Sequence, residues 1–383
     1  MKIIHIAQCP LSGGIGSYFD EIVPYQVDRF GAADISFVVA AGQADRIPAL
    51  IPRSQIVEFR GSGRSLRALS SFAIAAAVAI RRFQPALVHL HGKLAGAIVR
   101  PLLKLSIEPA AIVYCPHGWA FAMDVPKIQQ VLYRHCEWFL ASMADVIVNI
   151  SHSDRKDALA AGLPDELMVT VRNGISQRHA VSVACADTST IRLLFIGRHD
   201  RQKGLDILLE AFAQAKPTDT RLDIIGSPVL DLGRPPPVAN LEGVRFHGWM
   251  ARSDVFSMIA NSDAVIVPSR WEGFGLVTLE AMQAGKAVLA SRRGALQEIV
   301  EHQKTGLLFD IENSRSLTTL LCMLSKENLL AMGQEGRKKF ELEFGSARMN
   351  RELESAYSAA LSKRALRIAS RRVKSSVKSK RNV

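Results

Sequence analysis

The sequence has few of the features that mark a disulfide-bonded or zinc-binding protein. Its five cysteines are scattered, odd in number and without a Cys-x-x-Cys pair. Disulfide frameworks and most zinc sites depend on cysteines at paired, short spacings. The chain also has no Asp-x-Asp motif. We therefore expect a reducing compartment, no disulfides and no bound metal.

Long hydrophobic runs are absent as well. The longest wholly apolar run is Phe72–Ile80, far short of the ~20 residues that a membrane-spanning helix needs. The N-terminus has one lysine and too short an apolar run for a signal peptide. We expect a cytoplasmic protein whose membrane contact, if present, is peripheral.

Charge is unevenly distributed along the chain. The net charge is +12, and residues 363–383 carry nine basic residues and no acidic one, which leaves +3 for the rest. This basic tail fits either a disordered, solubilising end or contact with anionic lipid, at about 1 kcal/mol per basic residue. No aromatic residue interleaves the tail and no nucleic-acid motif is visible, so we expect no nucleic-acid partner.

Short apolar runs alternate with helical patterns along the whole chain, which is typical of parallel sheets covered by helices. In the first half, helices are predicted at 16–29, 64–83, 92–105 and 127–143. The pattern stops at the polar segment 182–190 and then begins again. The sequence thus predicts an α/β protein with domains at 1–182 and 190–345, a helix at 346–368 that packs back towards the first domain, and a disordered tail at 369–383.

Candidate ligand-binding residues follow the predicted strands, and ligands of such sheets bind beyond the carboxyl ends of the strands. In the second half, Arg198 and Lys203 lie between a strand and a helix. Such a turn suits a phosphorylated ligand, because the helix start adds free N–H groups and partial positive charge. Taken alone, Arg198 and Lys203 could equally be exposed loop residues without a ligand.

The stretch "WEGFGLVTLEAMQAG" places one carboxylate on either side of a glycine-rich turn. Glu272 precedes the glycines and could reach the reacting end of a ligand. Glu280 lies inside the following helix and could accept hydrogen bonds from a ribose diol. The backbone N–H groups between them, those of Phe274, Gly275 and Leu276, suit phosphate.

In the first half, Gly14 lies in the glycine-rich loop "SGGIG", and His117 follows a strand. The loop is weak evidence alone, because tight turns commonly use glycine. At the end of a strand, His117 could hydrogen-bond a sugar hydroxyl or serve a structural role, and its position favours the hydrogen bond. We expect His89 and His91, which alternate along one strand, to face opposite ways, to be mostly structural and not to share a metal.

The segments "GRHDRQKG", "EGFGLVTLE" and "VRNGIS", behind the "SGGIG" loop, resemble the retaining glycosyltransferases of family 4. The resemblance extends to about residue 365. It implies the GT-B fold, in which two Rossmann-like domains face each other across an interdomain cleft. It also implies a nucleotide-sugar donor, a glycan or lipid-linked acceptor and retention of anomeric configuration without a metal.

The resemblance also implies roles for residues at matching positions. Arg198 and Lys203 would bind the diphosphate, Glu272 would lie by the donor sugar, and His117 would contact the sugar ring. Glu280 would hold the ribose, and Phe274, Gly275 and Leu276 would offer backbone N–H groups. The backbone around Trp249 and Met250 would lie against the base, and Gly14 would line the cleft near the acceptor. Ser176 and the segment "IIGSP" depart from the family pattern, at the hinge and in the nucleotide pocket.

Other functions remain open from sequence alone. Glu272 and Glu280 could serve as the acid and base of a glycoside hydrolase, although a hydrolase has no diphosphate to bind. A nucleotide-sugar epimerase would act without an acceptor, and a degenerate relative would only bind. The helix 93–106, with Lys93, Arg100 and Lys104, is either an ordinary surface helix or a contact for a membrane-bound acceptor. The base, sugar, acceptor and oligomeric state are not specified.

Overall fold

The computed structural model describes residues 1–11, 13–61, 63, 65–105, 110–177, 189–228 and 241–380. It divides into two compact units. Unit 1 is Met1–Asn173 with Ser346–Val383, and unit 2 is Gly174–Gly345. The predicted boundary segment 182–190 lies outside the described residues up to 188. Among the described residues, no helix is both long and apolar enough to span a membrane.

Unit 1 is built on a seven-stranded parallel sheet in the order β3-β2-β1-β4-β5-β6-β7. Its strands are short, apolar and mostly buried on both faces, as expected where helices cover a parallel sheet. They are β1 Ile3–Ala7, β2 Ile35–Ala40, β3 Ile56–Phe59, β4 Leu87–His91, β5 Ala111–Cys115, β6 Val146–Asn149 and β7 Met168–Thr170.

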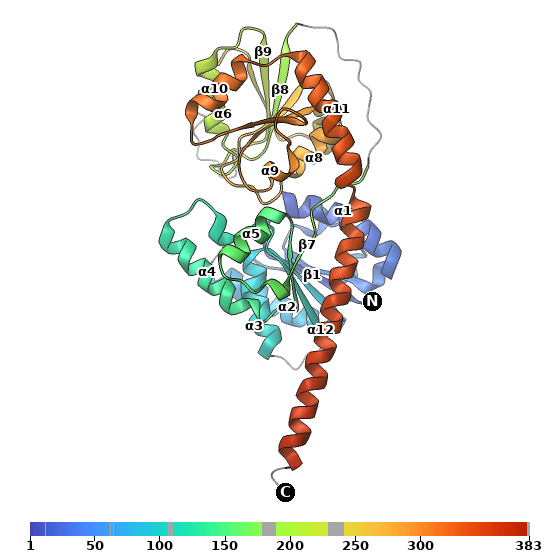
Figure 1. Ribbon diagram of the computed structural model, residues 1–383. Helices are drawn as coiled ribbons and strands as arrows, with labels where there is room; N and C mark the ends of the chain where they lie inside the picture. Colours follow the sequence, from blue (N-terminus) through green and yellow to red (C-terminus); the bar gives the residue numbers. More distant parts are fainter. Residues whose placement is uncertain are drawn as a thin grey trace. The chain divides into compact units, whose positions relative to one another are not determined.

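The helices of unit 1 pack on the two faces of this sheet (Figure 1). They are α1 Gly14–Phe30, α2 Leu66–Phe83, α3 Lys93–Leu105, α4 Lys127–Ala141 and α5 His152–Ala160. The described residues of this unit also form short 3₁₀ helices at Ala32–Asp34, Ala44–Arg46, Arg53–Gln55, Ala120–Ala122 and Asp165–Leu167. Ser65 and Ser151 cap α2 and α5 with their hydroxyl oxygens, which satisfies a backbone donor at each helix start.

Arg100, on α3, is not the surface cation that the sequence suggested. The Arg100 guanidinium is fully buried, pairs with Glu137 at 2.7 Å and lies 4.0 Å from the centroid of the Tyr114 ring. Its charge is therefore neutralised inside the unit. It contributes nothing to a basic surface for a membrane-bound acceptor.

Unit 2 repeats the architecture with a six-stranded parallel sheet in the order β10-β9-β8-β11-β12-β13. Its strands are β8 Ile191–Ile196, β9 Thr220–Ile225, β10 Val244–Gly248, β11 Ala264–Val267, β12 Ala287–Ser291 and β13 Gly306–Phe309. Its helices are α6 Leu205–Ala215, α7 Arg252–Asn261, α8 Leu276–Gln283, α9 Leu296–Ile299, α10 Ser314–Cys322 and α11 Lys326–Glu343. The prediction of two doubly wound α/β units is confirmed.

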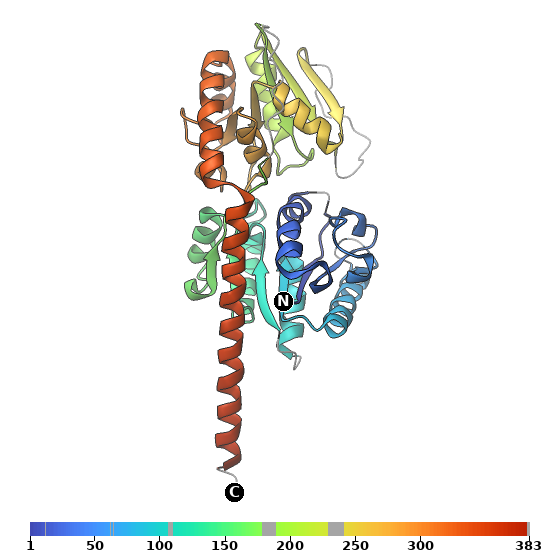
Figure 2. The same ribbon diagram turned by 90° about the vertical axis from the view of Figure 1, so that its right-hand side faces the viewer.

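The last helix, α12 (Ser346–Lys380), belongs to unit 1 and packs against β5 and β6. Arg367 pairs with Asp145 at 2.8 Å, and Tyr357 is buried. Both views show the C-terminal part of α12 extending past the other elements of unit 1 (Figures 1 and 2). The helix thus extends to Lys380, into the segment 369–383 for which disorder was predicted. These residues contain no proline or glycine to end the helix.

Candidate functional site

Two loops of unit 2 meet beyond the carboxyl ends of the adjacent strands β8 and β11. The Arg270 N–H donates to the Gln202 carbonyl at 2.8 Å, which joins the loops through their backbones. Gly204, the N-cap of α6, has a left-handed φ of +66°, and a Cβ there would lie 2.0 Å from the Pro268 carbonyl oxygen. Only glycine fits this position. The close approach brings Lys203 next to the second loop.

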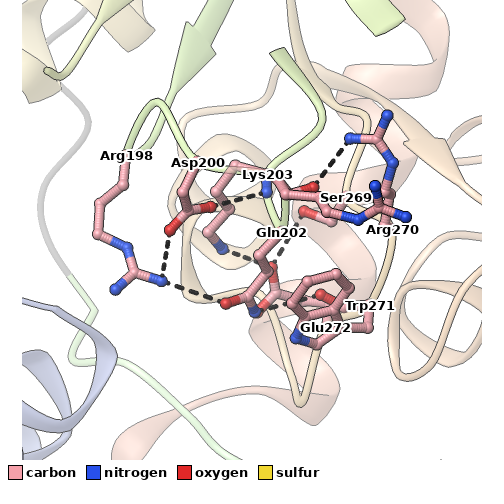
Figure 3. A network of polar contacts seen from close by, with 9 residues as sticks. Arg198, Asp200, Gln202, Lys203, Ser269, Arg270, Trp271 and Glu272 are labelled. Carbon is pink, nitrogen blue, oxygen red and sulfur yellow. Dashed lines mark hydrogen bonds and ion pairs between the residues drawn. The ribbon is translucent and has the colours of Figure 1, made fainter. Parts of the chain in front are cut away.

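Lys203 and Glu272 form the centre of this site. The Lys203 Nζ lies 2.5 Å from Glu272 Oε2, and the Ser269 hydroxyl donates to the same oxygen at 3.2 Å (Figure 3). Their side chains are 22% and 10% exposed, so the pair is largely shielded from water but open to a ligand. The structure therefore brings together two predicted site residues that lie 69 positions apart.

Arg198 lies at the edge of the same network (Figure 3). Its guanidinium pairs with Asp200 at 2.9 Å and donates to Gln202 Oε1 at 3.1 Å. The Gln202 amide donates in turn to the Trp271 carbonyl at 3.2 Å. Asp200 and Gln202 were not predicted to contribute, although both lie in the segment "GRHDRQKG". They hold the arginine while leaving 43% of its side chain exposed.

The start of α8 follows Glu272 directly. Gly275 is its N-cap, and neither a side-chain cap nor an acid in the first turn occupies the helix start. The first N–H groups of α8 therefore have no capping side chain, and helix starts of this kind favour anions. Phe274 anchors the turn, since it is buried and packs edge-to-face on Phe344 at 6.2 Å.

Glu280 lies within α8 and faces a cation that the sequence reasoning did not identify. Its Oε1 is 3.9 Å from the Arg252 guanidinium, at the first residue of α7. Trp249 is 59% exposed just after β10. Among the described residues, Trp249 and Met250 have no hydrogen bond or ion pair to the Lys203–Glu272 pair. No spacing in the sequence links Arg252 to Glu280, so only the fold could reveal this contact.

Gly14 and His117 both belong to unit 1. Gly14 is the first residue of α1, and a Cβ there would meet nothing within 4 Å. Packing instead requires Gly16, where a Cβ would lie 1.9 Å from the Leu11 carbonyl oxygen. His117 follows β5 with an unusual left-handed φ of +53°, which marks a constrained position for a residue other than glycine.

His89 and His91 face the same way, so the expectation that they point apart was wrong. Residues two apart on a strand share one face of the sheet. Their ring centroids are 4.0 Å apart, and both side chains are fully buried. His91 hydrogen-bonds to His5 at 2.9 Å and to His117 at 3.0 Å. His117 is thus the outer end of a buried histidine cluster.

Burial keeps these imidazoles neutral. Desolvation lowers the pKa of His117 to about 3 and that of His5 to about 4. It also lowers the pKa values of His89 and His91 well below 6.5, and repulsion from neighbouring histidines adds to the effect. A buried imidazolium without a carboxylate partner is costly. The cluster therefore works as a set of neutral donors and acceptors.

His5, His89 and His91 are also the one group of three or more potential metal ligands among the described residues. The nitrogens of His5 and His91 already hydrogen-bond to each other, to Gln26 and to His117. The group contains no carboxylate or thiolate to offset the charge of a cation. The contacts present thus describe a hydrogen-bonded network.

Comparison with known proteins agrees with this arrangement. A family model described as "Glycosyl transferase 4-like domain" matches residues 13–174, and one described as "Glycosyl transferases group 1" matches residues 190–327. The two matches together span most of both units.

Individual proteins are similar over most of their length. An uncharacterized 41.2 kDa protein in the cps region of Klebsiella pneumoniae is 27% identical over 332 residues, 84% of this chain and 89% of that protein. The N-acetyl-alpha-D-glucosaminyl L-malate synthase of Bacillus anthracis is 26% identical over 71% of this chain and 74% of its own.

A solved structure supports the fold. Anabaena Alr3699/HepE in complex with UDP-glucose has a TM-score of 0.76 at 20% identity, covering 94% of this chain and 100% of that one. The predicted GT-B fold is thereby confirmed. With both family models matched in order, the chain belongs to the group 1, family 4 glycosyltransferases, enzymes that use nucleotide sugars.

Proposed function

We propose that this enzyme is a retaining hexosyltransferase. It transfers a hexose from a UDP- or GDP-sugar to a hydroxyl group of a glycan or a lipid-linked sugar, in the synthesis of a bacterial-type polysaccharide or glycolipid. The observation that carries the proposal is the contact between Lys203 and Glu272, with Arg198 beside it, at the carboxyl ends of β8 and β11. A glycoside hydrolase has no use for two such cations.

The chemistry explains why cations belong here. When the bond between the anomeric carbon and the diphosphate breaks, negative charge grows on the departing phosphate. Preorganised donors aimed at that charge lower the barrier, by about 3 kcal/mol for a single donor at comparable oxyanion sites. Lys203, Arg198 and the N–H groups at the start of α8 are the donors that we assign to this role.

Each of the two cations is paired with a carboxylate. Lys203 pairs with Glu272, and Arg198 pairs with Asp200. We propose that the diphosphate replaces these carboxylates as the partner of both cations. Release of Lys203 would leave Glu272 free to hydrogen-bond the transferred sugar, so one event would both bind the phosphate and prepare the sugar site.

The remaining predicted residues have secondary roles in this proposal. Glu280 would hold the ribose, with Arg252 fixing the orientation of its carboxylate. The backbone near Trp249 and Met250 would lie against the base. From unit 1, His117 would contact the donor sugar and Gly14 would line the approach of the acceptor. The UDP-glucose in the Anabaena structure supports a uridine nucleotide as the first donor to test.

The basic residues near the C-terminus support a membrane-bound acceptor. Of the nine basic residues in 363–383, Lys363 and Arg367 are engaged with unit 1, through the Glu166 carbonyl and Asp145. We propose that the basic residues of the segment 369–383 contact an anionic membrane surface and bring the enzyme to a lipid-linked acceptor. The protein would then act at the cytoplasmic face of a membrane.

A thermal-shift panel of UDP- and GDP-sugars tests the donor, because a ligand that binds only the folded state raises the melting temperature. Nucleotide release is then measured with and without a mixture of glycan and lipid-linked acceptors. Release that requires an acceptor supports transfer. Equal release without one would indicate hydrolysis, and interconversion of the sugar without release would indicate an epimerase.

A further inference from the structure

A continuous chain of hydrogen bonds runs through the core of unit 1 to His117. It starts at Gln26 on α1, whose Oε1 lies 2.7 Å from His5 Nε2. His5 Nδ1 lies 2.9 Å from His91 Nε2, and His91 Nδ1 lies 3.0 Å from His117 Nε2. Gln26, His5 and His91 are buried. Each imidazole between the ends thus uses both of its ring nitrogens.

A chain of neutral imidazoles has a direction. Each neutral ring has one N–H donor and one acceptor nitrogen, so fixing one end fixes every ring in turn. Gln26 is the end that fixes the direction of the hydrogen bonds. Its Nε2 donates to the Tyr357 hydroxyl at 3.1 Å, which leaves the acceptor Oε1 facing His5. His5 therefore carries its proton on Nε2 and accepts on Nδ1.

The same rule, one donor nitrogen and one acceptor nitrogen in each neutral ring, fixes the protons of His91 and His117. Because His5 accepts on Nδ1, His91 must donate from Nε2 and accept on Nδ1, and His117 must then donate from Nε2. This leaves His117 Nδ1 unprotonated. Among the described residues this nitrogen has no hydrogen-bond partner, and the side chain is only partly buried. His117 therefore offers a lone pair, and not an N–H, to whatever approaches it.

We propose that Gln26, acting through His5 and His91, fixes the tautomer of His117 so that its Nδ1 accepts a hydrogen bond from a hydroxyl group of the donor sugar. The sugar contact rests on the function proposed above, whereas the tautomer rests on unit 1 alone. Gln26, His5 and His91 are positioning residues, since they act on the sugar only through His117.

This assignment has a consequence for specificity. A hydroxyl can donate to His117 Nδ1, whereas a fluorine at the same ring position cannot. An analogue with fluorine in place of that hydroxyl therefore binds more weakly, by roughly three- to tenfold for one lost hydrogen bond. A histidine with the opposite tautomer would donate an N–H and tolerate the fluorine far better.

The tautomer is measured by ¹⁵N NMR of the histidine-labelled full-length protein, with His117 assigned from the His117→Gln variant. We expect an unprotonated Nδ1 and a protonated Nε2. His91→Leu breaks the chain and Gln26→Leu removes its anchor, so both should give a mixture of tautomers at His117. In His91→Gln, the side-chain amide can donate to His5 and accept from His117, and this variant should keep the wild-type tautomer.

His89→Gln is the matched control. His89 is as buried as His91 and lies on the same strand, but its hydrogen bond goes to the Tyr357 hydroxyl at 2.8 Å. A glutamine oxygen can still accept from that hydroxyl, so Tyr357 remains an acceptor for Gln26. This variant should leave the His117 tautomer unchanged. A protonated Nδ1 in the wild-type protein overturns the proposal, and this measurement needs no core variant to fold. An unchanged tautomer in folded His91→Leu overturns it equally.

The sugar contact is tested by the dissociation constants of donors fluorinated at each ring position in turn. Wild-type protein should bind one of them roughly three- to tenfold more weakly than the parent donor, and His91→Leu should reduce this difference. Equal binding of all analogues overturns the sugar contact. Failure of the proposed function would show elsewhere, as normal turnover in Lys203→Ala, and would leave the tautomer result intact.

Discussion

Replacing Lys203 with alanine removes the cation at the centre of the site. The burial of this ion pair indicates how much stability the substitution costs. Lys203 is 22% exposed and its partner Glu272 is 10% exposed, and among the described residues the substitution leaves the Glu272 carboxylate with only the Ser269 hydroxyl as a hydrogen-bond partner. This pair is intermediate between an exposed ion pair and a buried one. We expect a loss of about 1–2 kcal/mol in the free energy of unfolding, which leaves the protein folded.

The cost to catalysis should be larger. If Lys203 stabilises the departing diphosphate, its loss removes one preorganised donor from the transition state. Comparable donors contribute roughly 100- to 1,000-fold in turnover. We therefore expect kcat/KM for the nucleotide sugar to fall by about that factor in Lys203→Ala. Steady-state nucleotide release in the presence of acceptor measures kcat/KM, and urea unfolding measures stability.

Lys339→Ala provides a matched control within unit 2. Lys339 is 11% exposed and pairs at 2.9 Å with Glu301, which is 41% exposed and also pairs with Lys304, so its removal breaks a lysine–glutamate pair of the same unit. It lies on α11, outside the loops after β8 and β11. We expect a smaller loss of stability, because Glu301 keeps Lys304 as a partner, and unchanged kcat/KM. Near-normal turnover in Lys203→Ala, or an equal loss in both variants, would refute the role assigned to Lys203.

Three further predictions follow from other parts of the molecule. Gly204→Ala, which would place a Cβ 2.0 Å from the Pro268 carbonyl at a left-handed φ, should destabilise unit 2 by about 1–3 kcal/mol and lower turnover, as measured by urea unfolding and kinetics. Unfolded histidine titrates near 6.5 but His5 only at about 4. The unfolded state thus binds more protons as the pH falls below 6.5, and stability should fall by about 1.4 kcal/mol per pH unit for each such histidine. A flat urea-unfolding profile between pH 7 and pH 5 would contradict the neutral cluster. Deleting residues 369–383 should weaken cosedimentation with anionic vesicles but not turnover of a soluble acceptor, and unchanged cosedimentation would exclude the lipid contact.

Much of the fold could be predicted because its signals are local. Apolar runs indicated the strands of both sheets except β3, whose residues 56–58 are only partly buried, and the glycine-rich stretch before Leu276 indicated the start of α8. The motif residues Arg198, Lys203 and Glu272 could be placed because the ends of neighbouring parallel strands meet at one edge. Each of these inferences needs only a short window of sequence and one general rule.

The errors and omissions have different physical origins. The face of His91 was assigned against the two-residue period of a strand, and the structure corrects it. Arg252 and Gln26 were missed because their partners, Glu280 and Tyr357, lie far away in the sequence. The burial of Arg100 depends on Glu137 from another helix. Long-range polar pairs of this kind leave no periodic signal in the sequence.

The measurement that tests the central claim most directly compares the binding of a nucleoside diphosphate with that of its nucleoside. Calorimetry is carried out with UDP and uridine, or with GDP and guanosine if the thermal-shift panel selects that base, on wild-type protein and on Arg198→Ala and Lys203→Ala. If these cations grip the phosphates, each substitution should weaken binding of the diphosphate by about tenfold or more and leave binding of the nucleoside unchanged. Equal affinity of wild type and variants for the diphosphate would contradict the account.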